Sequence, residues 1–120
     1  MYLKQSDATE EAMHRLHEGD GTVRACRLFP DDSRLPTKMA VWELDPGSSE
    51  GSHVHEGLGA LEEIYYFLQG SGVMWVDGEE VEVRTGDVVM VSPGADHGFR
   101  NSGDSVLKLL IAWGPPEDAA

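Results

Sequence analysis

Three histidines and one glutamate have the residue types and the spacing of a metal site. His53 and His55 stand two residues apart in a run that predicts a strand, so both imidazoles leave the same face and can reach one ion. Glu63 begins the next strand run, and an inward carboxylate there requires a cation, because burying a lone charge is expensive. His97 then supplies the fourth ligand. This donor set suits one divalent transition metal, whether Mn, Fe, Co, Ni, Cu or Zn.

The alternation of side chains along a strand favours Glu63 as the ligand and indicates a further site residue. Because side chains alternate along a strand, Glu63, Tyr65 and Phe67 share one face. Glu62 falls on the other face and is a rival ligand, and Glu56 is a weaker rival. An ion with open coordination positions would hold a small oxygenated molecule, to which Tyr65 would donate a proton or a hydrogen bond. The aromatic candidates for pocket wall or core are Trp42, Trp75, Trp113, Tyr65, Phe67 and Phe99.

The elements that must position these ligands are short strands. Runs rich in Val, Leu, Trp and Tyr, separated by Gly, Pro, Asn and Asp, are typical of strands and turns. Such runs predict strands near residues 23–29, 38–44, 51–56, 62–68, 72–76, 79–84, 88–91, 97–101 and 106–113. Asp77 and Gly78 predict a hairpin with a type I′ turn, because both accept positive φ angles and Val residues alternate on either side. Many short strands with no helix between them predict an all-β sandwich or barrel.

The two ends of the chain have different patterns from its middle. Asp7 and the apolar residues that follow at helical spacing predict a short helix near the N-terminus. His14 and His17 are three residues apart on that helix, a spacing that usually means surface residues, and we place them outside the site. We expect an N-terminal extension over residues 1–22, a barrel over 23–113 and a flexible tail over 114–120.

Composition limits the classes of partner. A chain of 120 residues fits one domain. Its formal charge of −13 repels phosphate backbones and anionic membranes, so neither nucleic acid nor a membrane surface is an expected partner. The single cysteine, Cys26, excludes an internal disulfide and is expected to pack as a small hydrophobe, as in a reducing compartment. Residues 1–7 lack a signal-peptide pattern and no run is apolar enough to span a bilayer, so we expect a cytoplasmic protein.

The ligand candidates fall in two stretches that resemble the two motifs of the cupin family. The first stretch holds Gly47, His53, His55, Glu63 and Gly70, and the second holds Gly86, Gly94, His97 and Asn101. Two departures stand out. Ser92 occupies the place of the motif's proline, with Pro93 one step later, and the loop between His55 and Glu63 is longer than usual. Neither departure removes a ligand.

The resemblance implies a single-domain, cupin-type antiparallel β-barrel, or jelly roll, and a wide range of activities. Our main hypothesis is a metal-dependent enzyme of dioxygenase, isomerase or lyase type that acts on a small oxygenated molecule. The alternative is a non-catalytic cupin in which the same ion anchors a sugar or a carboxylate. The sensor half of a transcription factor is disfavoured, because the short acidic N-terminus does not fit a DNA-binding segment. We also expect a homodimer, as is common in the family.

Overall fold

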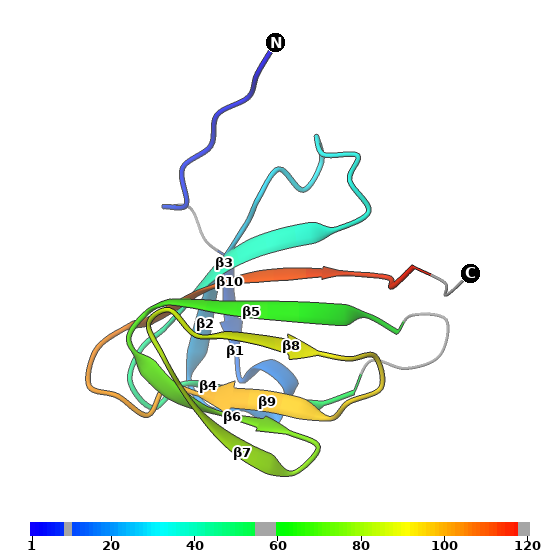
Figure 1. Ribbon diagram of the computed structural model, residues 1–120. Helices are drawn as coiled ribbons and strands as arrows, with labels where there is room; N and C mark the ends of the chain where they lie inside the picture. The colour runs from blue at the N-terminus through cyan, green and yellow to red at the C-terminus, as the bar shows by residue number, and fades with distance from the viewer. Residues whose placement is uncertain (9–10, 55–59, 118–120) are drawn as a thin grey trace.

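The computed structural model describes residues 1–8, 11–54 and 60–117. In these residues the chain forms strands and one 3-10 turn (Figure 1). The elements are β1 (Glu11–His14), η1 (Leu16–Glu18), β2 (Thr22–Arg27), β3 (Lys38–Leu44), β4 (Ser49–His53), β5 (Glu62–Gln69), β6 (Ser71–Val76), β7 (Glu79–Arg84), β8 (Val88–Val91), β9 (His97–Arg100) and β10 (Leu107–Gly114). No helix among the described residues is long and apolar enough to cross a membrane.

The strands form two antiparallel sheets that face each other across one core (Figure 1). The larger sheet has the order β1-β2-β3-β10-β5-β8, and the smaller has the order β4-β9-β6-β7. The core lies between them: Tyr65 and Phe67 of β5 contact Phe99 of β9 with ring centroids 5.7 and 6.2 Å apart. The predicted all-β, single-domain jelly roll is therefore confirmed.

Strand alternation produces this core. On β5 the side chains of Glu63, Tyr65 and Phe67 are buried, whereas Ile64 and Tyr66 are exposed, which confirms the predicted parity. The predicted hairpin is also confirmed. Asp77 and Gly78 have φ angles of 49° and 80°, as a type I′ turn requires, and they join β6 to β7.

The predicted N-terminal helix is wrong. Residues 11–14 form strand β1, which pairs with β2 so that Met13 lies opposite Val23 and packs against the core. Only a single 3-10 turn, η1, follows. A short isolated helix is marginal in water, whereas pairing with β2 satisfies the same backbone groups and buries Met13. Cys26 of β2 is buried, as predicted.

Candidate metal centre

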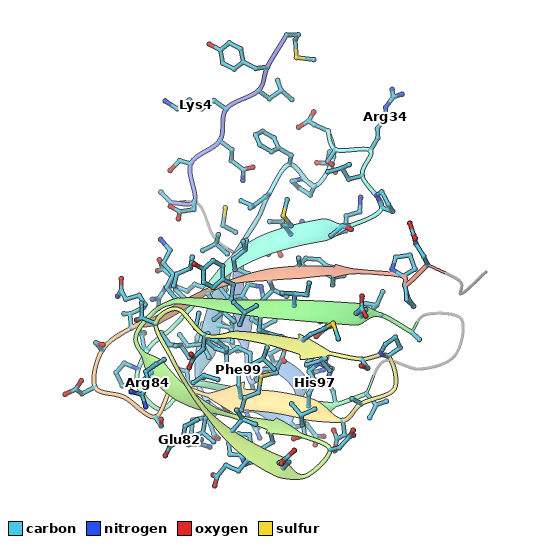
Figure 2. All side chains as sticks on the ribbon, in the orientation of Figure 1. Lys4, Arg34, Glu82, Arg84, His97 and Phe99 are labelled. Atoms are coloured by element: carbon cyan, nitrogen blue, oxygen red, sulfur yellow. The ribbon has the colours of Figure 1, made fainter. Side chains whose placement is uncertain are left out.

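Three strands bring three of the predicted ligands to one place. His97 of β9 and Glu63 of β5 are buried, at 2% and 6% exposed, and His53 is at the end of β4. The Nε2 atom of His97 lies 2.8 Å from Oε2 of Glu63, and the His53 and His97 rings have centroids 4.2 Å apart. Candidate ligand atoms of all three residues lie within 4.8 Å of one another. Figure 2 shows His97 and Phe99 of β9 in the space between the two sheets.

Backbone carbonyls orient both imidazoles. The Nδ1 atom of His97 lies 2.9 Å from the carbonyl oxygen of Ala95, and Nδ1 of His53 lies 3.0 Å from that of Gly51. A carbonyl can only accept, so each Nδ1 carries the proton and donates it. Each Nε2 is then the nitrogen with the lone pair in the neutral ring, which is the usual arrangement of a metal-binding histidine.

This tautomer provides a test of whether a metal fits. In neutral His97, a lone pair on Nε2 faces a carboxylate oxygen of Glu63 at 2.8 Å, and two acceptors at that distance need a positive charge beside them. In the metal-free protein a proton on His97 supplies this charge. Burial lowers the pKa of His97, but the hydrogen bonds with Glu63 and with the Ala95 carbonyl outweigh burial, so the pKa is raised. A divalent cation bound by the same atoms would supply the charge instead. The residues present therefore fit a metal ion.

Tyr65 and Glu50 extend the polar site beyond these ligands. The Tyr65 hydroxyl donates a hydrogen bond to Oε2 of Glu63 and lies 3.5 Å from Oε1 of Glu50. Glu50 is 2% exposed, and burial, reinforced by the charge of Glu63, raises its pKa to about 8. Burial and the two neighbouring carboxylates raise the pKa of Tyr65 well above its ordinary value. Tyr65 is therefore a neutral donor at physiological pH.

A pocket opens onto this polar cluster. Its volume is about 170 Å³. Of the predicted aromatic wall residues, Trp42, Trp113 and Tyr65 line it, whereas Phe67 and Phe99 are fully buried in the core. The remaining lining residues are Met13, Leu16, His17, Glu50, His53, Leu61, Glu63 and Ile111. The walls are thus mainly apolar, with the polar groups gathered at one side.

The structure describes three of the four predicted metal ligands. His53, Glu63 and His97 lie together. His55 lies outside the described residues, as does Glu56, and β4 ends at His53. The rival Glu62 has the opposite parity to Glu63 on β5 and lines a separate surface pocket with Ile64.

Sequence reasoning missed Glu50 and His17, which both line the pocket. By strict alternation Glu50 would point away from His53, since they are three residues apart. The pairing of β4 with β9 shifts register between these two residues, which brings both side chains to the site. Gly51, within this interval, was the available signal, because a glycine inside a strand often marks a bulge. His17 was placed outside the site because its segment was predicted to be a helix.

Comparisons with known proteins agree with this fold. The family described as Cupin domain matches residues 40–113. The oxalate-binding protein of Thermotoga maritima is 35% identical over 92% of this chain and 90% of its own length. An uncharacterized protein of Methanocaldococcus jannaschii is 44% identical over 81% of this chain and 76% of its own. A Thermotoga maritima crystal structure described as a predicted oxalate decarboxylase has a TM-score of 0.86 at 32% identity, covering 97% of this chain and 100% of that one.

Proposed function

This chain belongs to the cupin family, and we propose that the protein holds a divalent metal ion, which it uses to bind a small dicarboxylate of the oxalate class. The observation that carries the proposal is the convergence of His53, Glu63 and His97, which come from three different strands, beside a pocket that His53 and Glu63 line. His55 completes the ligand set in this proposal. The name of the Thermotoga maritima relative, an oxalate-binding protein, supports the class of ligand.

Pocket size and wall chemistry favour a ligand of a few heavy atoms. Pockets for drug-sized molecules are typically about 300 Å³ or more, and this one is about 170 Å³. A bound divalent ion would supply a Lewis acid that attracts carboxylate oxygens. Trp42 and Trp113 contribute apolar surface to the pocket wall, and the Tyr65 hydroxyl keeps Glu63 oriented by its hydrogen bond. The chain's own residues thus fix the ion and shape the space beside it.

Calorimetry and thermal melting test the proposal. The metal-free protein is titrated with Mn²⁺, and the Mn²⁺ form with oxalate. We expect oxalate to raise the melting temperature only when metal is present, because a ligand at 100 times its Kd stabilises by about 2.7 kcal/mol. His97→Ala, which we expect to keep the fold but which lacks a ligand atom, serves as the control and should lose both the metal and the oxalate response. Equal oxalate effects with and without metal would contradict the proposal.

Turnover of the bound molecule is the second candidate. The observation in its favour is Glu50, a buried carboxyl that lies 3.5 Å from the Tyr65 hydroxyl and lines the pocket, and whose pKa in the metal-free protein is raised to about 8 by burial and by the charge of Glu63. The Thermotoga maritima structure described as a predicted oxalate decarboxylase also supports this candidate. Release of CO₂ or uptake of O₂ by the metal-loaded protein with oxalate would establish turnover, whereas melting shifts without product favour binding alone.

A further inference from the structure

The N-terminal turn η1 brings another histidine to the pocket. The ring of His17 stacks on that of His53, with centroids 3.7 Å apart and planes inclined by 13°. Candidate ligand atoms of His17, Glu50 and His53 lie within 4.8 Å of one another, and His17 lines the pocket. His17 is exposed, whereas Glu63 and His97 are buried. It therefore stands on the outer side of His53, toward the pocket mouth.

Close backbone packing holds this turn in place. A Cβ atom on Gly51 of β4 would lie 1.9 Å from the carbonyl oxygen of His17, and one on Gly19 would lie 2.3 Å from that of Ser49. Only glycine allows such an approach at both positions. The Ser49 amide donates to the Asp20 carbonyl at 2.8 Å, and the Asp20 amide donates to the Ser49 hydroxyl, also at 2.8 Å. The position of His17 is thus set by the fold.

The turn also has an unusual backbone. Arg15, His17 and Glu18 have φ angles of 50°, 52° and 63°, in the left-handed region that residues other than glycine rarely adopt. Strained conformations of this kind persist where the surrounding structure fixes them, and they cluster at binding and catalytic sites. An ordinary connection between β1 and β2 would not need this strain. The conformation places the His17 ring over His53.

We propose that His17 recognises the carboxylate of the bound ligand that lies farther from the metal; this rests on the proposed dicarboxylate function. A metal held by His53, Glu63 and His97 would bind the nearer carboxylate, and His17, the exposed histidine that stacks on His53 and lines the pocket, would then be available to the other end of the ligand. An imidazole N–H is a suitable donor to a carboxylate oxygen. A second ion shared by His17 and His53 is disfavoured, because Nδ1 of His53 donates to the Gly51 carbonyl and leaves one lone-pair nitrogen for one ion.

The test compares His17→Ala with His14→Ala, an exposed histidine of the same segment whose Nδ1 lies 2.9 Å from the Thr22 hydroxyl. Each variant is titrated with Mn²⁺ and then, as the Mn²⁺ form, with oxalate and with acetate. For His17→Ala we expect oxalate binding to weaken by about tenfold, the loss of one hydrogen bond to a charged group, with Mn²⁺ and acetate binding unchanged. His14→Ala should match the parent protein throughout, and His17→Gln, which retains an N–H donor, should recover part of the oxalate affinity.

Each result decides between explanations. Unchanged oxalate binding in His17→Ala would overturn the inference while leaving the proposed function intact. Loss of Mn²⁺ binding in His17→Ala would also overturn it, since His17 would then belong with the metal ligands. If acetate binding weakened as much as oxalate binding, recognition of the far carboxylate would be excluded. Failure of the parent Mn²⁺ form to bind oxalate at all would instead overturn the proposed function, so the two failures are distinguishable.

Discussion

Glu63 connects the parts of the candidate site. Its carboxylate accepts a hydrogen bond from Tyr65, lies 2.8 Å from Nε2 of His97, and belongs to the same cluster of ligand atoms as His53. A single side chain therefore links the polar groups of β5 to the histidines of β4 and β9. Its charge, more than its shape, should determine whether a divalent ion is held.

Glu63→Gln tests this dependence on charge. The amide has nearly the same shape but carries no negative charge, so Mn²⁺ binding should weaken by at least about tenfold. Glu62→Gln is the matched control, because Glu62 is the adjacent residue on the opposite face of β5. Calorimetric titration of both variants with Mn²⁺ measures the difference. Equal weakening in the two variants would mean that overall charge, rather than the Glu63 position, governs binding.

We expect Glu50 to make the stability of the metal-free protein depend on pH. Burial and the charge of Glu63 raise its pKa from 4.5 to about 8, so the folded state holds a proton that the unfolded state releases between these values. Because the folded state binds more protons in this window, the free energy of unfolding falls as pH rises from 4.5 to 8, by up to about 1.4 kcal/mol per pH unit.

Urea unfolding in the presence of a chelator, at intervals from pH 5 to pH 8, measures this slope. Glu50→Gln cannot ionise, so its unfolding free energy should depend less on pH in this range. Glu82→Gln, an exposed glutamate of β7, provides the control and should keep the slope of the parent protein. A slope that persists in Glu50→Gln would assign the effect to other groups.

At the level of elements, the close approach of η1 to β4 is the most specific contact of the N-terminal segment. A methyl group on Gly51 would meet the His17 carbonyl oxygen at 1.9 Å, so Gly51→Ala must displace the turn. We expect a loss of stability of about 1–3 kcal/mol, as for other overpacked sites, and weaker oxalate binding by the Mn²⁺ form. Ser52→Ala, at the exposed next position of β4, should change neither urea unfolding nor oxalate binding. Unchanged properties in Gly51→Ala would show that η1 can move without consequence.

Elements whose pattern is complete within one strand could be predicted from the sequence. The alternation of β5 identified Glu63 as inward, and Asp77 and Gly78 identified the β6–β7 turn. Elements whose conformation depends on pairing with another strand could not be predicted in this way. The register shift of β4 exists only in its pairing with β9, which is why Glu50 was missed, and β1 is a strand because β2 is beside it. A helical spacing of apolar residues over one turn is too short to exclude that outcome.

At the scale of the whole molecule, one outer face is unusually apolar. On β5 and β8 the exposed side chains Ile64, Tyr66, Leu68, Val88 and Met90 range from 37% to 59% exposed. Ile64 is paired with Met90 and Tyr66 with Val88, so these residues form one continuous area at the edge of the larger sheet. In a chain of net charge −13, a second copy can approach more easily over this mainly apolar area, which has Glu62 at its end beside Ile64, than over a carboxylate-rich surface. The homodimer predicted from the sequence would therefore use this face.

Light scattering tests this prediction. The parent protein should have a mass near twice 13.1 kDa. Met90→Glu places a charge in the middle of the apolar face and should give the monomer mass, whereas Leu35→Glu, at a residue 59% exposed outside both sheets, should remain a dimer. A monomeric parent protein at working concentrations would contradict the prediction, and a dimeric Met90→Glu would place the interface elsewhere.

The position of η1 has a practical consequence for how this protein is prepared. Residues 11–18 supply Met13, Leu16 and His17 to the pocket wall. A polyhistidine segment added to the protein would supply imidazoles that compete with the native ligands for the ion. Metal content measured on protein without an added polyhistidine segment therefore reports the ion that the protein itself selects.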